Sequence, residues 1–230
     1  MNDIPEKPTA GAHGLFAAFG NKTKPVHVID DDGNITKGLY LPRKGDDFYP
    51  TPPEPTRAFC KAEMRRLSQF KHILEPAAGN GCMARDLHEC TGIHVLLSDI
   101  VDRGCGANII SFYDYLDLPL NTCIVTNPPF NECNWRDGKA KWMRHALENL
   151  ECKYMALLLP WGWMGAGGMG GFWKDHPPAR VYLMRWKIDF TGQGAPPMLN
   201  CWAVWDKEHK GETVLRMLDK YDDPRQPEFV

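Results

Sequence analysis

The sequence predicts an α/β fold with a mostly parallel, twisted sheet that ends in an antiparallel hairpin. Short apolar runs alternate with polar stretches of helical spacing, which is typical of parallel strands joined by helices. The last two apolar runs, 180–190 and 200–206, are separated by only about ten residues, too few for a crossover helix, so they should pair antiparallel. With 230 residues, 43% of them hydrophobic, the chain can bury one core.

The expected elements follow from this pattern in chain order. Eight of the 19 prolines lie in the first 55 residues, so 1–45 should be an irregular arm with at most one short hairpin around Asp32-Gly33-Asn34. The folded domain should span 46–206, and 207–230 should be a C-terminal helix or tail. Helices are expected over 54–69, from about 82, and over 139–148, and strands over 72–74, 94–97, 122–126, 154–159, 180–190 and 200–206.

Composition excludes several classes of function. The eight cysteines contain no Cys-x-x-Cys pair, so no metal site is expected. The longest apolar run is about eight residues, whereas a membrane-spanning helix needs roughly 20. The first residues lack a secretory signal, and we expect a cytoplasmic protein. Because the net charge is −2, binding to nucleic acid would require a local basic patch.

The first candidate site is a glycine turn. Residues 73–81 read Ile-Leu-Glu-Pro-Ala-Ala-Gly-Asn-Gly, a strand that enters a tight turn before a helix, and nucleotides bind at such turns. Asp99, 18 residues beyond Gly81, ends the next strand and suits a ribose diol. An ordinary strand-to-helix turn is an equally good interpretation of the glycines alone, and Gly79-x-Gly81-x-x-Ala84 also fits a dinucleotide fingerprint loosely.

The second candidate site is Asn127-Pro128-Pro129-Phe130, which directly follows the apolar strand 122–126. The carboxyl edge of a parallel sheet is where ligands bind. The prolines restrict the backbone, and the Asn127 side chain and the Pro128 carbonyl each offer an acceptor for an exocyclic NH₂ group, with Phe130 able to stack on the ring. The alternative is an Asn-Pro turn that merely closes a strand.

Together these motifs, about 45 residues apart, resemble those of the S-adenosylmethionine-dependent DNA adenine-N6 methyltransferases, especially the compact types of phages and mobile elements. The resemblance covers about 46–206. It implies a Rossmann-like class I methyltransferase fold and S-adenosyl-L-methionine as cofactor. It also implies direct methyl transfer to a flipped adenine in double-stranded DNA, with Asn127, Pro128, Pro129 and Phe130 as the catalytic residues and no catalytic cysteine.

The resemblance also implies ligand-binding residues. Tyr49-Pro50-Thr51-Pro52 resembles the segment that lies against the methionine end of the cofactor, and Asp114-Tyr115-Leu116 resembles the step that contacts its adenine amine. The implied cofactor-binding residues are Thr51, Glu75, Pro76, Ala77, Gly79, Gly81, Asp99 and Asp114.

Substrate contacts should come from the second half of the chain, since 24 residues after Asp206 leave no room for a recognition domain. We expect them from Arg136, Lys139, Lys141, Trp161 and Gly165, with 161–173 as a mobile glycine-rich loop that orders around DNA. A short or relaxed target preference should result.

Other functions fit the same motifs. Relatives with Asn-Pro-Pro-Tyr methylate a glutamine side-chain amide in proteins through the same acceptors, and RNA adenine is a third substrate. A binding or decoy protein that keeps the fold without activity is the alternative from a different class. We expect a site-specific adenine DNA methyltransferase, as in restriction-modification.

Overall fold

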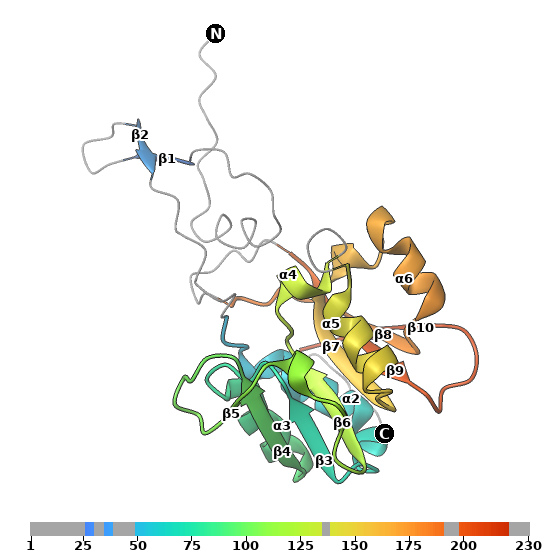
Figure 1. Ribbon diagram of the computed structural model, residues 1–230. Coiled ribbons are helices and arrows are strands. Elements are labelled where there is room, and N and C mark those ends of the chain that lie inside the picture. Colours follow the sequence, from blue (N-terminus) through green and yellow to red (C-terminus); the bar gives the residue numbers. More distant parts are fainter. Residues whose placement is uncertain (1–25, 30–34, 39–48, 135–138, 191–197, 221–230) are drawn as a thin grey trace.

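A computed structural model describes residues 26–29, 35–38, 49–134, 139–190 and 198–220. Its centre is an eight-stranded sheet with the order β10-β8-β9-β7-β6-β3-β4-β5 (Figure 1). The strands are β3 (His72–Glu75), β4 (His94–Asp99), β5 (Asn108–Ile109), β6 (Thr122–Thr126), β7 (Tyr154–Pro160), β8 (Arg180–Met184), β9 (Asn200–Asp206) and β10 (Val214–Leu218).

Pairing in this sheet confirms the expected fold class. From β5 through β4, β3 and β6 to β7, all neighbours are parallel. Strand β9 runs antiparallel to both β7 and β8. The sheet is therefore mostly parallel and contains the antiparallel hairpin that the short connection predicts.

Two apolar cores, one on each face, explain why the central strands are continuous hydrophobic runs. Every residue of β6 and β7 is buried. Alternate residues point to opposite faces, so Ala156 belongs to one core and Met155 to the other. A parallel sheet buried on both faces requires such runs, which is the signal that the sequence carries.

Helices cover both faces. The helices α2 (Pro53–Leu67) and α3 (Cys82–Thr91) supply Phe59, Leu67 and Leu87 to the first core. The second core is covered by short elements: η2 (Phe112–Asp114), α4 (Phe130–Cys133), α5 (Lys141–Arg144), which continues as the π-helical turn η3 (His145–Asn149), and α6 (Gly170–Asp175).

Helix α2 is fixed to the sheet by buried polar contacts. Arg180 on β8 donates to Glu63 of α2 (Nε to Oε1, 2.6 Å) and to Asp206 at the end of β9 (Nη2 to Oδ2, 2.9 Å). Arg66 pairs with the other Asp206 oxygen at 3.0 Å. Tyr154 donates its hydroxyl to Glu63 at 3.1 Å. These contacts give the carboxylates of Glu63 and Asp206 oppositely charged partners, as burial demands.

Three regions differ from the expectation or extend it. The hairpin β1 (Val26–Ile29) and β2 (Ile35–Gly38) lies within the expected arm, and its turn lies outside the described residues. The described part of 207–230 contains β10 and no helix, so the sheet extends beyond 206, because β10 pairs in parallel with β8. Residues 221–230 lie outside the described part.

The glycine-rich segment after β7 is the third region. The expected glycine-rich loop, 161–173, contains η4 (Trp161–Trp163), η5 (Gly167–Met169) and the start of α6. Its mobility without DNA stays a prediction. Met169 and Phe172 are buried, and Phe172 contacts Trp205 of β9 with ring centroids 6.2 Å apart. These apolar anchors hold the segment against the sheet. Within the described part of the chain, no helix has the length and apolar character needed to cross a membrane.

Candidate active site

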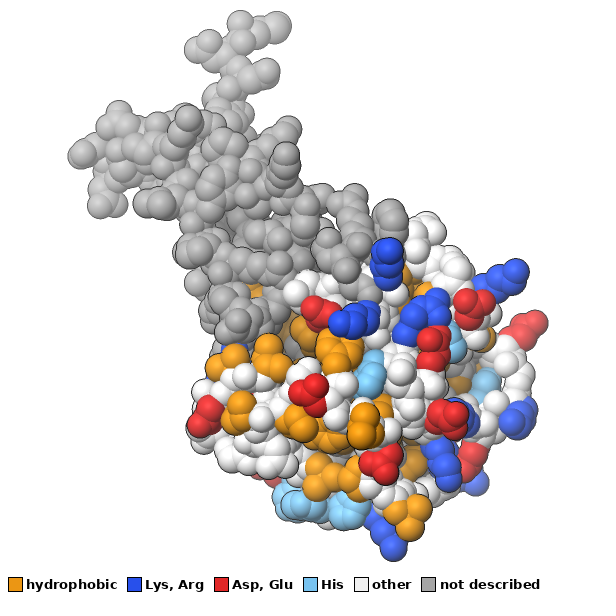
Figure 2. All heavy atoms as spheres, viewed as in Figure 1, with side chains coloured by type: hydrophobic (Ala, Val, Ile, Leu, Met, Phe, Trp, Pro, Cys, Tyr) orange, Lys and Arg blue, Asp and Glu red, His pale blue; other side chains and the backbone are white. Residues whose placement is uncertain are grey.

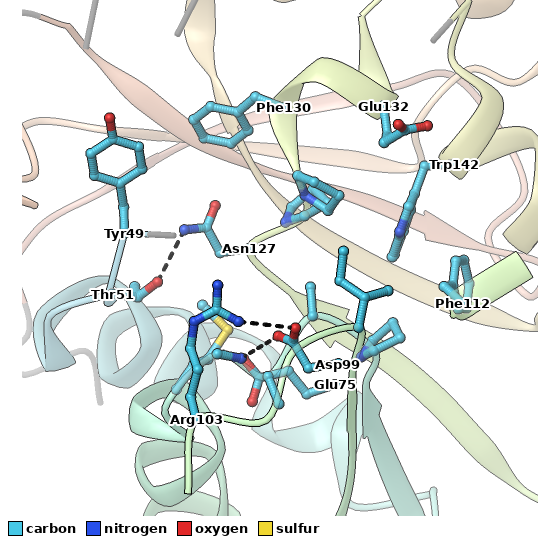
Figure 3. Close-up of a pocket in the computed structure, with 18 of the residues that line it drawn as sticks. Tyr49, Thr51, Glu75, Asp99, Arg103, Phe112, Asn127, Phe130, Glu132 and Trp142 are labelled. Atoms are coloured by element: carbon cyan, nitrogen blue, oxygen red, sulfur yellow. Dashed lines mark hydrogen bonds and ion pairs between the residues drawn. The ribbon is translucent and has the colours of Figure 1, made fainter. Parts of the chain in front are cut away.

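A pocket of about 570 Å³ opens at the carboxyl ends of β3, β4 and β6, the edge where the sequence places both motifs (Figure 3). Its size is that of a small-molecule site. Among its lining residues are all four residues of the Asn-Pro-Pro-Phe motif and most of the predicted cofactor residues: Thr51, Glu75, Pro76, Ala77, Gly79, Asp99, Asn127, Pro128, Pro129 and Phe130.

The glycine turn adopts a conformation that other residues rarely adopt. Gly79 and Gly81 have φ values of 56° and 74°, in the left-handed region. A side chain at Gly81 would also place its Cβ 3.1 Å from the Cβ of Cys105. The turn therefore needs glycine for backbone geometry and for space, and it delivers the chain from β3 to the first residue of α3, Cys82. Gly81 itself is buried and is not among the lining residues.

Asp99 closes the turn from the neighbouring strand. Its Oδ2 accepts the backbone N–H of Gly79 at 2.7 Å, and its Oδ1 accepts that of Val101 at 2.9 Å. Arg103 donates to the same Oδ1 at 3.3 Å. The carboxylate is thus held at the pocket wall where the sequence predicts a ribose-binding acid.

Glu75 ends β3 beneath the turn. It is buried, and burial raises the pKa of its carboxyl well above the ordinary value. One of its oxygens, Oε2, is buried without a hydrogen-bond partner among the described residues. A backbone hydrogen bond from Ala84 lowers this pKa only in part, and the Oε2 atom at the pocket wall can form a hydrogen bond with a ligand.

Asn127 presents its side-chain oxygen without a partner. Its amide Nδ2 donates to the hydroxyl of Thr51 at 3.1 Å, and Thr51 is itself buried. The oxygen, Oδ1, is buried and accepts no hydrogen bond from the described residues. A buried acceptor without a hydrogen bond carries a desolvation penalty. A ligand N–H that donates to this oxygen would remove that penalty.

Phe130 follows at the first turn of α4. Its ring is largely buried and meets the ring of Trp163 edge to face, with centroids 5.4 Å apart. Trp163 in turn accepts a hydrogen bond from Trp173 on its carbonyl. An aromatic wall therefore stands next to the Asn127 acceptor.

Comparison with known proteins places the fold. No family model and no curated protein matches the sequence. Among solved structures, a type I restriction-modification methyltransferase subunit from Streptococcus thermophilus is 14% identical, with a TM-score of 0.51 over 74% of this chain. The chain has the class I methyltransferase fold.

Two further structures have lower scores. A candidate class I S-adenosylmethionine-dependent methyltransferase from Listeria monocytogenes is 14% identical, with a TM-score of 0.49 over 76% of this chain and 67% of its own. A modification subunit of a candidate type I restriction enzyme from Vibrio vulnificus is 12% identical, with a TM-score of 0.49 over 74% of this chain. This chain spans 47% and 46% of the two type I subunits.

Within this methyltransferase fold, one predicted cofactor residue lies elsewhere. Asp114 is exposed and is not among the lining residues, whereas Ser111, Phe112 and Tyr113 are. The reason is the tight turn η2, where Ser111 accepts the backbone N–H of Tyr113 at 3.2 Å and Asp114 follows on the outer side. Phe112 stacks on Trp142 with ring centroids 4.3 Å apart. The cofactor-binding role of Asp114 stays a prediction, and Ser111 is the polar residue of this turn that reaches the pocket.

The predicted substrate residues that the structure describes do not line the pocket. Lys139 and Lys141 are exposed, and Lys141 sits 4.0 Å from the ring centre of Tyr113. Trp161 is half-buried and Gly165 exposed. Arg136 lies outside the described residues. On the face shown in Figure 2, Lys and Arg side chains are interspersed with Asp and Glu.

Several lining residues were not predicted. Arg103 and Glu132 are charged, and Trp142 and Phe190 are aromatic. Arg103 follows the predicted ribose acid by four residues and Glu132 follows Phe130 by two, so these two residues have a local signal. The aromatic residues reach the pocket through tertiary packing, which a single sequence does not display.

Proposed function

We propose that the chain is an S-adenosyl-L-methionine-dependent methyltransferase that methylates adenine N6 in double-stranded DNA. One observation carries the proposal: Asn127, whose amide nitrogen donates to Thr51, lies in the same pocket as the glycine turn and Asp99, and its buried side-chain oxygen has no partner among the described residues. The pocket thus combines a nucleoside-type site with an acceptor for an amine.

The residues present fit the cofactor. Gly79 and Gly81 keep the turn free of side chains, and the Asp99 carboxylate faces the pocket with lone pairs that suit ribose hydroxyls. Ile100 and Phe112 provide apolar walls for a purine. When bound, S-adenosylmethionine supplies an electrophilic methyl group on a sulfonium.

Asn127 acts on the target amine. The lone pair of an adenine amine is delocalised into the ring, so the amine becomes a good nucleophile only when it is pyramidal. A fixed acceptor for one N–H favours that geometry and stabilises the charge that develops on nitrogen, an electrostatic effect of the preorganised type. We expect the Pro128 carbonyl to accept the second N–H.

Phe130 offsets the cost of removing the base from the duplex. Flipping costs a few kcal/mol, and stacking on an aromatic side chain returns about 1–3 kcal/mol per base. Trp163 supports the Phe130 ring from its edge. The Streptococcus thermophilus subunit, from a restriction-modification system, supports DNA as the substrate in preference to RNA or protein.

A direct test offers tritiated S-adenosylmethionine with DNA, RNA and protein separately. Transfer to N6 of adenine in duplex DNA is the expected result. Transfer to RNA adenine or to glutamine amides alone would replace the proposed substrate, and binding without any transfer would indicate a cofactor-binding protein. Calorimetry with NAD provides the control, since equal binding of NAD would contradict the cofactor assignment.

A further inference from the structure

The strand β10 is an exposed, apolar edge of the sheet. It is the last strand in the sheet order, and among the described strands it pairs only with β8. Residues 211–217 are all exposed, and the large apolar side chains Val214, Leu215 and Met217 are 37%, 52% and 56% exposed. An edge strand of this kind readily pairs with another chain, so most proteins cover or interrupt it.

The outer side of β10 has backbone groups that are free to pair. The Val214 N–H donates to Ala179 O at 3.0 Å, toward β8. Because backbone groups alternate sides along a strand, those of Thr213 and Leu215 point away from β8. The strand contains no proline, no lysine and no residue with a positive φ, which are the features that usually block an edge.

The charges around β10 are complementary to a second copy of the same strand. Glu212 and Arg216 are exposed, and neither has an ion-pair partner among the described residues. Antiparallel pairing of two copies around Val214 sets each Glu212 opposite Arg216 of the other copy. Pairing around Arg216 would oppose two guanidinium groups, and pairing around Leu215 or Met217 would oppose no charges of opposite sign. Only the register around Val214 gains cross-strand ion pairs.

We propose that a second copy of this chain pairs with β10 in this antiparallel register, so that one sheet continues through both copies. Thr213 of each copy then lies opposite Leu215 of the other, and the two exchange backbone hydrogen bonds through the groups that point away from β8. Each copy contributes the same residues, as in an isologous dimer. An unrelated peptide strand could make the backbone bonds but would lack the reciprocal charge pairs.

The candidate active site stays open in such a dimer. The pocket lies at the carboxyl ends of β3, β4 and β6, and β7, β9 and β8 separate these strands from β10. Because antiparallel pairing reverses the strand direction, the two pockets open at opposite edges of the continuous sheet. The proposal therefore does not depend on the cofactor or the substrate, and the two sites should bind ligands independently.

The test measures the molar mass of the full chain by sedimentation equilibrium over a range of protein concentrations. One strand from each copy makes a small interface, so we expect a monomer–dimer equilibrium in the micromolar range. Leu215→Pro removes an N–H on the outer side without removing a bond to β8, and it should abolish the dimer. Thermal melts establish that each variant is folded.

Charge reversal tests the register. Arg216→Glu should raise the dimer dissociation constant at least about tenfold, because two pairs of like charges would then face each other. Adding Glu212→Arg to this variant should restore the wild-type dissociation constant. The control is Arg65→Glu, which makes the same change in charge at an exposed position of α2 and should leave the dimer unchanged.

Hydrogen exchange adds a readout at single residues. The amides of Thr213 and Leu215 should be protected at high protein concentration and should exchange faster on dilution. A wild type that stays monomeric at every concentration would overturn the proposal, and protected amides in that monomer would mean that another part of the chain covers β10. A dimer that persists in Leu215→Pro, or one that the double charge reversal fails to restore, would also overturn it.

Discussion

Replacing Asn127 by alanine should lower turnover by two to three orders of magnitude and leave cofactor affinity almost unchanged. The side-chain oxygen is buried with no partner among the described residues, and the amide nitrogen donates to Thr51 at 3.1 Å, so the acceptor is preorganised. Removing one such group costs about 2.7–4 kcal/mol in the transition state. At about 1.36 kcal/mol per decade, the rate falls on the order of 10²–10³-fold.

The measurement is single-turnover transfer of a tritiated methyl group to duplex DNA at saturating cofactor, with calorimetry for S-adenosylmethionine. Thr51→Val is a milder variant for comparison. It removes the hydroxyl to which the Asn127 amide donates and leaves the Asn127 side-chain oxygen in place. Loss of a neutral hydrogen bond of about 0.5–1.5 kcal/mol should slow transfer roughly two- to tenfold, and Thr51→Ser should restore it.

The two changes should not add. In the Asn127→Ala background, Thr51→Val should have little further effect on the rate, because its partner is already gone. An alanine variant with wild-type turnover, or one that loses turnover only through cofactor affinity, would refute the role of Asn127. Neither the amide nor a backbone carbonyl titrates near neutrality, so these acceptors should impose no bell-shaped pH profile.

Other predictions concern the walls of the pocket. Gly81→Ala should destabilise the fold by more than the about 1–2 kcal/mol that a left-handed backbone costs a non-glycine residue, because the new Cβ would meet Cys105. It should also weaken S-adenosylmethionine binding. Gly92→Ala is the control, since Gly92 has a φ of 69° and open space around it, and urea unfolding of this variant measures the backbone strain alone. Burial raises the pKa of Glu75, so its contribution to stability is complete below the ordinary value of 4.5 and is lost as pH rises through the folded-state pKa. Glu75→Gln should therefore gain stability relative to wild type as pH rises, and parallel pH curves of unfolding free energy would contradict this. Trp163→Ala should raise the KM for DNA about two- to tenfold without changing cofactor affinity, the cost of one edge-to-face contact; an unchanged KM would show that the contact has no part in substrate binding.

Much of the fold can be read from the sequence where burial is nearly uniform. The runs 122–126 and 154–159 form fully buried strands because a sheet covered on both faces requires apolar residues at every position. The glycine turn and Asn127 reach one pocket because parallel strands end at the same edge. These are consequences of local pattern and topology, and they could be predicted.

The rest depends on long-range packing. Val214 to Met217 of β10 are exposed, so the strand has little burial signal and exists through pairing with β8. The segment from η5 into α6 packs on the sheet through the contact between Phe172 and Trp205 of β9. The glycine content of the segment does not reveal this contact. The choice between Ser111 and Asp114 turns on one tight turn that brings the first to the pocket and the second to solvent.

The anchoring of α2 gives the two walls of the pocket different mechanical character. Thr51 lies just before α2, while Arg66, near the other end of this helix, is tied to Asp206 beside the start of β7, at the opposite edge of the sheet. Helix α2 therefore fixes the position of Thr51, and of the pocket wall beside it, relative to the core. The facing wall includes Phe130, whose ring meets Trp163 of the short turn η4, and the glycines of η4 and η5 are exposed. Laboratory evolution toward new DNA target sequences should therefore accumulate substitutions in 161–169. Helix α2, and with it cofactor binding, should stay unchanged.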